Sequence, residues 1–174
     1  MNSLKRLSFI IFLAVLLVSC SDDEEVDRDY SPSDYPDILT IQGDPEYEDQ
    51  LNTSLFFDKG SWTGYALRET ESPGFSGPYA LNTQKWILKA SNKISCRIDG
   101  EETNFTQVDK TFYPGRLSQE FQAETITLKQ EMIFASANHA AIQTTLTNNS
   151  SEDVVLNLIL SGEAFAPGLA EKEN

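Results

Sequence analysis

Alternation of apolar and polar residues runs through the second half of the sequence and limits the fold more than any other feature. Residues 93–99, 124–135 and 139–147 place apolar side chains mostly at alternate positions. A period of two residues is that of an extended strand with one buried face. The predicted inward residues are Ile94, Cys96 and Ile98, then Ile126, Leu128, Met132 and Phe134, then Ala140, Ile142, Thr144 and Leu146. Residues 80–162 contain no convincing amphipathic helix.

Short turn motifs separate these strands and predict how they pair. Asp99-Gly100 is a two-residue hairpin signal, for which the partner strand is expected within residues 103–108. Pro114-Gly115 predicts a second turn before a short strand at 117–122, and residues 148–151 predict a third. Consecutive strands joined by short turns form antiparallel sheets, and a sheet with one apolar face needs a second sheet to cover it. The sequence therefore predicts an all-β fold, an antiparallel β-sandwich of the supersandwich kind.

The last predicted strand has a different pattern. Residues 154–160 are apolar at every position except Asn157, which is typical of a central strand covered on both faces. A central strand so close to Asn174 implies missing neighbours, and about six strands are few for a sandwich. We therefore expect an incomplete sandwich, with this chain as the first part of a longer protein.

Residues 56–79 concentrate four of the nine glycines and six aromatic residues. Glycine permits sharp turns and close backbone approach, while the aromatic rings of Trp62, Tyr65, Phe75 and Tyr79 supply large apolar area with polar tips. We predict a structured loop whose aromatic side chains plug the core of the β domain. The alternative is a loop that packs on a second domain or on a sugar.

The N-terminus has the features of a bacterial lipoprotein. Lys5 and Arg6 precede an apolar run at residues 7–18, which is too short to span a bilayer and is typical of a signal peptide, predicted here at residues 1–19. Leu17-Val18-Ser19-Cys20 matches a lipobox, in which cleavage precedes Cys20 and the cysteine is lipidated. The acyl chains would then anchor the protein to the membrane. An ordinary signal peptide with a chance cysteine is the alternative.

Residues 20–50 are predicted to be a disordered tether, with the folded domain at residues 51–174. Residues 21–50 carry twelve acidic residues, three prolines and the single base Arg28, so they bury too little apolar surface to offset the entropy of ordering. The acidic run directly after Cys20 resembles an export signal for cell-surface lipoproteins, and a plain spacer is the alternative. The expected location is the outer membrane, with the periplasmic and the cell-surface face both open.

Composition excludes several classes of function. Without residues 1–19 the chain has 11 basic and 27 acidic residues, so no basic stripe can bind nucleic acid. If Cys20 carries lipid, Cys96 has no disulfide partner and is most simply a small buried hydrophobe. His139 is the only histidine and follows no nucleophile motif, so we predict no catalytic residue, no cofactor and no histidine or cysteine metal site. An oxygen-only calcium site stays open.

Several segments resemble the N-terminal β-sandwich of bacterial α-glucosidases of glycoside hydrolase family 63. The most specific are Phe-Phe-Asp-Lys-Gly-Ser-Trp-Thr-Gly-Tyr-Ala-Leu at residues 56–67 and Gly-Phe-Ser-Gly-Pro at 74–78. Weaker matches continue through Ile98-Asp99-Gly100-Glu101 and residues 113–117, 128–135 and 160–163. The resemblance covers residues 52–165.

The resemblance implies a sandwich packed on an (α/α)6 barrel, which holds the two carboxylates that hydrolyse α-glucosides with inversion. Neither carboxylate motif occurs in this sequence, so the chain alone is expected to be inactive and its parent protein to be the enzyme. The partners implied are the barrel and an oligosaccharide substrate. Asp58, Trp62 and Phe75 match the sandwich motif and are expected in the core or at the contact with the barrel; direct sugar contact is the alternative.

Two competing readings make different structural demands. A stand-alone glycan-binding lipoprotein would need a complete sandwich in which Trp62, Tyr65, Phe75 and Tyr79 are exposed as a stacking platform. A chain that hydrolyses glycosides by itself would need two facing carboxylates about 5 to 10 Å apart in a cleft.

Overall fold

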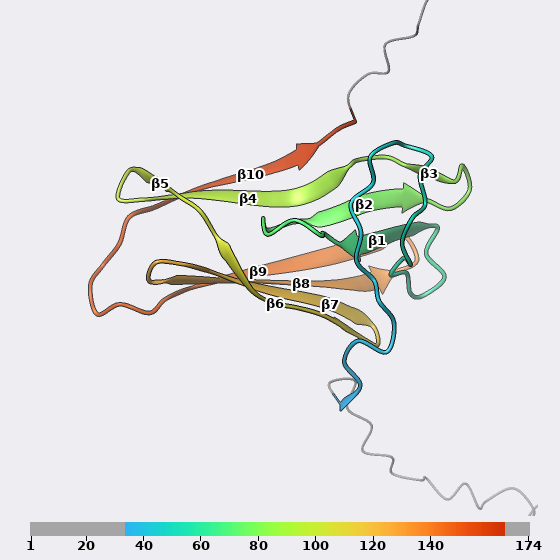
Figure 1. Ribbon diagram of the computed structural model, residues 1–174. Coiled ribbons are helices and arrows are strands. Elements are labelled where there is room, and N and C mark those ends of the chain that lie inside the picture. The colour runs from blue at the N-terminus through green and yellow to red at the C-terminus, as the bar shows by residue number, and fades with distance from the viewer. Residues whose placement is uncertain (1–33, 166–174) are drawn as a thin grey trace, which may run out of the picture. The chain divides into compact units, whose positions relative to one another are not determined.

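The protein is described by a computed structural model that covers residues 34–165, which lie within one compact unit, Pro32–Asn174. The predicted signal peptide, Cys20 and the first part of the predicted tether fall outside the described residues. Residues 34–165 contain no α-helix, and their strands form two antiparallel sheets that face each other (Figure 1). The predicted antiparallel β-sandwich is therefore confirmed.

The first sheet contains six strands. Its main path runs β1 (Thr63–Leu67), β2 (Phe75–Ala80), β4 (Ala90–Ile98) and β10 (Leu156–Glu163). Two short strands lie off this path, β3 (Lys85–Trp86) beside β2 and β5 (Glu101–Thr103) beside β4. The order therefore brings the last strand, β10, beside β4, which lies far earlier in the chain (Figure 1).

The second sheet is a four-stranded meander, because each strand pairs with the next one along the chain. Its strands are β6 (Thr106–Tyr113), β7 (Arg116–Ala123), β8 (Ile126–Ser136) and β9 (His139–Asn148). The inward residues predicted for β8, Ile126, Leu128, Met132 and Phe134, are all buried. Those predicted for β4, Ile94, Cys96 and Ile98, are buried as well, which confirms the period-two interpretation of both strands.

The strand expected to pair across the Asp99-Gly100 turn is shorter than predicted. The hairpin itself forms, since Ile98 lies opposite Glu101 and Cys96 opposite Thr103. The chain then crosses to the second sheet, where Thr106 begins β6. Phe105 packs on Phe121 with ring centroids 6.5 Å apart, so this crossing buries an aromatic ring between the sheets instead of extending the hairpin.

The glycine-rich stretch is not only a loop, as predicted, but contains the paired strands β1 and β2. Glycine is needed where these strands approach other backbone. Gly77 has a φ of +112°, and a Cβ there would lie 3.0 Å from the carbonyl oxygen of Gly64. The predicted role of the aromatic residues as a core plug is confirmed for Phe75 and Tyr79, which are buried.

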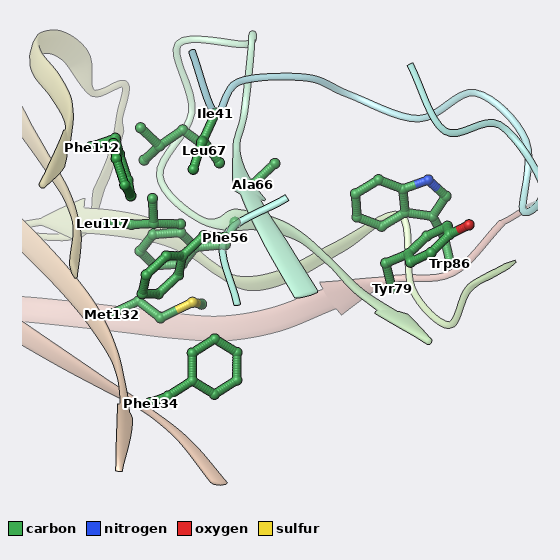
Figure 2. Packing of buried hydrophobic residues seen from close by; sticks show 11 residues of the cluster. Ile41, Phe56, Ala66, Leu67, Tyr79, Trp86, Phe112, Leu117, Met132 and Phe134 are labelled. Atoms are coloured by element: carbon green, nitrogen blue, oxygen red, sulfur yellow. The ribbon is translucent and has the colours of Figure 1, made fainter. Parts of the chain in front are cut away.

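The largest core cluster joins both sheets and the segment before β1. Phe56 packs against Phe112 and Phe134, with ring centroids 6.2 and 5.4 Å away. Figure 2 shows this group beside Leu117 and Met132, with Trp86 and Tyr79 farther along the cluster. The indole nitrogen of Trp86 donates a hydrogen bond of 2.6 Å to the carbonyl of Gln50. The core therefore depends on residues that precede the first strand.

The predicted tether therefore extends too far, because residues 41–50 pack on the sandwich. Ile41 is buried in the main cluster, and its carbonyl accepts a hydrogen bond from the amide of Leu67. Asp44 forms an ion pair of 3.0 Å with the buried Arg68. These contacts offset the entropy cost of ordering an acidic, proline-containing segment. Composition alone did not reveal the contacts.

Strand β10 is not the doubly covered central strand that its sequence predicted. It pairs with β4 and no other strand among residues 34–165, and thus forms an edge of the first sheet. Leu158 lies opposite Cys96 and Leu160 opposite Ile94, so both leucines point to the inner face of the sandwich. They are nevertheless 41% and 66% exposed, because no side chain of the second sheet covers them. The sandwich is open along this side.

Candidate functional site

The loop that leads into β1 is held in one backbone conformation by its own hydrogen bonds. The amide of Lys59 donates to the Asp58 carboxylate at 2.6 Å, and the amide of Ser61 donates to the Asp58 carbonyl at 2.9 Å. Lys59 and Gly60 both have positive φ, 51° and 70°, which closes the turn. The buried hydroxyl of Ser61 accepts from the amide of Thr63 and so fixes the start of the strand.

This rigid loop presents two large aromatic side chains to solvent. Phe57 is 54% exposed and Trp62 is 68% exposed. A shallow cavity of about 420 Å³ lies between them and is closed on one side by Leu81. The carbonyl of Trp62 accepts a hydrogen bond from the amide of Leu81, which ties the loop to the end of β2. We call the group of Phe57, Asp58, Lys59, Trp62 and Leu81 the loop surface; Asp58 and Leu81 are partly buried in it.

The five residues predicted to contact a domain or a glycan do not form one surface. Asp58 and Trp62 belong to the loop surface. The Asp58 carboxylate lies near the β6–β7 turn, since a Cβ added to Gly115 would be 3.8 Å from it. Phe75 and Tyr79 are 0% and 3% exposed, inside the core. Tyr65 is partly buried, with its ring 6.0 Å from that of Phe134, and burial raises the pKa of its hydroxyl. The four exposed rings that the glycan-binding alternative required are therefore not present together.

Sequence reasoning missed two members of the loop surface, Phe57 and Leu81. The exposure of Phe57 could have been predicted, because Phe56 points into the core and its neighbour in an extended chain must point away from it. Leu81 carries no comparable signal, since its place depends on the pairing of β1 with β2.

The best-connected carboxylate of the described residues has a structural role. Asp44 accepts hydrogen bonds from Arg68, from the amides of Glu69 and Thr70, and from the hydroxyl of Ser76. Burial raises the pKa of the Asp44 carboxyl, but the hydrogen bond and positive charge of Arg68, with the other donors, outweigh burial and hold the pKa below its usual value. Asp44 therefore remains ionised and joins the N-terminal segment to β1 and β2.

Lys110 completes this polar cluster from the second sheet. Its ammonium group donates to the carbonyls of Arg68 and Thr70. Burial lowers the pKa of Lys110 to about 8, and nearby Arg68 contributes in the same direction. The cluster links both sheets to the N-terminal segment, although the buried Arg68 Nη1 atom has no hydrogen-bond partner among the described residues.

Two carboxylates, Glu71 and Glu102, line a second cavity of about 390 Å³ beside β5. Both residues are exposed, whereas the acid of a glycosidase is held in a site of low polarity. Glu163 instead binds Lys93 at 2.6 Å and Lys89 at 3.4 Å, and the Lys93 hydrogen bond is the main cause of its lowered pKa. Glu71 and Glu102 therefore lack the environment of a glycosidase acid, and Glu163 is engaged by two lysines.

The remaining reactive side chains are also accounted for by local structure. His139 begins β9 in an exposed position and its Nδ1 lies 2.9 Å from the hydroxyl of Ser136. Cys96 is buried, and burial followed by the charge of Glu124 raises the pKa of its thiol. Within residues 34–165 no three potential metal-binding side chains gather, and no helix there is long and apolar enough to cross a membrane.

A comparison with protein families assigns this sandwich. A family model described as the N-terminal domain of the glucosidase YgjK matches residues 39–173. The match begins close to Ile41, the first residue of the main core cluster, and so includes the segment that had been predicted as tether. It spans both sheets and most of the chain. The chain therefore belongs to the family of YgjK glucosidase N-terminal domains.

Proposed function

We propose that this chain is the non-catalytic N-terminal module of a lipid-anchored α-glucosidase related to glycoside hydrolase family 63. The family match to a glucosidase N-terminal domain carries this proposal. The exposed positions of Glu71 and Glu102, which lack the environment of a glycosidase acid, agree with a module that leaves hydrolysis to another domain. In the full protein, an (α/α)6 barrel formed by later residues holds the acid and the base.

The open side of the sandwich supports a continuation of the chain. Leu158 and Leu160 point into the space between the sheets but remain largely exposed. An uncovered row of apolar side chains on an edge strand is a site for pairing and burial. We propose that later residues of the same polypeptide add strands beside β10 and cover this row.

The reaction proposed for the barrel is inverting hydrolysis of an α-glucoside. One carboxylic acid protonates the leaving oxygen, while a carboxylate on the opposite face of the sugar activates water. The glycosidic bond breaks as water attacks the anomeric carbon, so an α-glucoside releases β-glucose first.

The experiment has two readouts on the native protein extracted from its membrane. Intact mass should exceed that of Cys20–Asn174 by several tens of kilodaltons, and proton NMR of the reaction with an aryl α-glucoside, whose only sugar product is glucose, should show β-glucose before mutarotation. First appearance of α-glucose would overturn the inverting mechanism. A mass equal to Cys20–Asn174 with acyl chains would overturn the glucosidase proposal.

Lipidation of Cys20 and location in the outer membrane form the second part of the proposal, supported by the lipobox and the acidic run that follows it. Cys20→Ser should remove the acyl mass and release the protein from membranes. Protease added to intact cells should degrade a surface-exposed protein and spare a periplasmic one. Unchanged membrane partition of Cys20→Ser would contradict the lipid anchor.

A further inference from the structure

We propose that the core of the sandwich contains a binding site for one water molecule, between the ammonium group of Lys110 on β6 and the side-chain oxygen of Gln119 on β7. The bound water completes a row of hydrogen bonds that crosses the core from the second sheet to the first. The site belongs to the sandwich itself and does not depend on the proposed function.

A row of polar side chains crosses the inner face of the second sheet. Lys110 lies opposite Gln119 in the β6–β7 pairing, and Gln119 lies opposite Gln130 in the β7–β8 pairing. Both glutamines are fully buried, and Lys110 is partly buried. Apolar side chains of two separate core clusters flank the row, Leu117 and Met132 on one side (Figure 2), Phe121 and Leu128 on the other. Polar groups in such a position are stable only when they are hydrogen-bonded.

The hydrogen bonds of the two glutamines determine which end of each amide is the oxygen. The side-chain nitrogen of Gln119 donates to the carbonyl of Gly74 at 2.9 Å and to the side-chain oxygen of Gln130 at 2.8 Å. The side-chain nitrogen of Gln130 donates to the carbonyl of Asn92 at 3.1 Å. Because a carbonyl can only accept, turning either amide around would place two oxygens in contact. The row therefore has one direction, from Gln119 through Gln130 to β4.

The acceptor at the start of this row is unpaired within the described residues. The side-chain oxygen of Gln119 is buried, and no residue between 34 and 165 donates a hydrogen bond to it. A buried acceptor without a donor costs free energy, so native proteins supply such atoms with a protein group or an ordered water. Because the amide nitrogen contacts Gln130 on β8, we expect the oxygen on the side of β6, where Lys110 is the facing residue.

Lys110 has a donor to spare for this acceptor. Its ammonium group donates to the carbonyls of Arg68 and Thr70, and an ammonium group has three N–H bonds. Side chains of directly opposite residues start about 5 Å apart, so one water can reach both groups. Water accepts from the ammonium group and donates to the amide oxygen, whereas the oxygen would repel an anion and the ammonium group a metal ion.

The test is a crystal structure of the full chain at a resolution that shows ordered water. A water oxygen should lie about 2.7 to 3.2 Å from both the Lys110 nitrogen and the Gln119 side-chain oxygen. In solution, oxygen-17 magnetic relaxation dispersion counts the water molecules that stay bound for long times. Gln119→Met should remove one such molecule. Gln143→Met is the matched control, because Gln143 is exposed on β9 of the same sheet, and it should remove none.

Three results would overturn the proposal. A direct hydrogen bond from Lys110 to Gln119 in the crystal structure would leave no place for the water, and an unoccupied site would show that none binds. An unchanged number of long-lived waters in Gln119→Met would show that Gln119 does not hold one. The crystal structure requires only the wild-type chain, so the test remains decisive even if a variant fails to fold.

Discussion

Strands β8 and β10 have apolar inner faces of similar composition, yet one is fully covered and the other is open. On β8, Ile126, Leu128, Met132 and Phe134 are almost completely buried, whereas Leu160 of β10 keeps 66% of its surface in water. Both strands point these residues between the sheets. The difference is that β8 has a strand on each side and the first sheet above it, while β10 is an edge. The alternation of apolar and polar residues therefore determines which face of the sheet a side chain points to. The neighbouring strands determine whether that side chain is buried.

Truncation of Leu128 should give the largest loss of stability. Leu128→Ala removes a fully buried side chain and leaves a cavity between the sheets, which should lower the free energy of unfolding by about 3 kcal/mol. Urea denaturation followed by tryptophan fluorescence measures this loss. A loss below about 1 kcal/mol would mean that the covered side is not packed as described.

A substitution in the polar cluster around Asp44 should give the next largest loss of stability. The size of this loss should depend on pH. Asp44→Asn weakens the ion pair of the buried Arg68 guanidinium and should cost about 2 kcal/mol at neutral pH. Because folding lowers the pKa of Asp44, its stabilisation is full above the unfolded pKa of about 3.9 and is lost as pH falls through the lower folded value. The difference between wild type and variant should therefore shrink below about pH 4. A difference that stayed constant down to pH 2 would contradict this role.

The buried glutamine pair tests the link between the sheets on the covered side. Gln119 donates to Gln130 at 2.8 Å and to the carbonyl of Gly74 at 2.9 Å, and Gln130 donates to the carbonyl of Asn92. Gln130→Met should cost about 1 to 2 kcal/mol, because it leaves buried polar groups without partners. In a double-mutant cycle with Gln119→Met, coupling of about 1 kcal/mol is expected, and independent effects would argue against a connected network.

Leu160→Ala on the open side should have the smallest effect in the mature chain that ends at Asn174. Since Leu160 is mostly solvated, its truncation should cost less than about 1 kcal/mol in the same urea assay. In the full-length protein the cost should rise by roughly 1 kcal/mol or more, if later residues cover this side chain. Equal costs in both proteins would show that the open side stays open.

Much of the fold could be predicted from local pattern. Period-two alternation identified the buried faces of β4 and β8, and the Asp99-Gly100 and Pro114-Gly115 turns located two hairpins. The burial of Cys96 followed from its place in that alternation. These features could be predicted because each depends on residues within a few positions of one another.

Features that depend on distant partners could not be predicted. The packing of residues 41–50 requires Arg68 for Asp44 and Trp86 for Gln50, which composition does not reveal. The exposure of β10 depends on which strands lie beside it, so its apolar sequence predicted a covered strand. In the candidate site, Asp58 and Trp62 were identified from the sequence, but their separation from Phe75 and Tyr79 follows from the β1–β2 pairing.

Hydrogen exchange of β10 in the native protein tests most directly whether this sandwich is one module of a larger glucosidase. Residue-resolved mass spectrometry would compare the β10 amides that point away from β4 in the native protein and in a mature chain ending at Asn174. The account predicts slow exchange of these amides in the native protein and rapid exchange in the shorter chain, because added strands would bond to the open edge. Equally rapid exchange in both would contradict it.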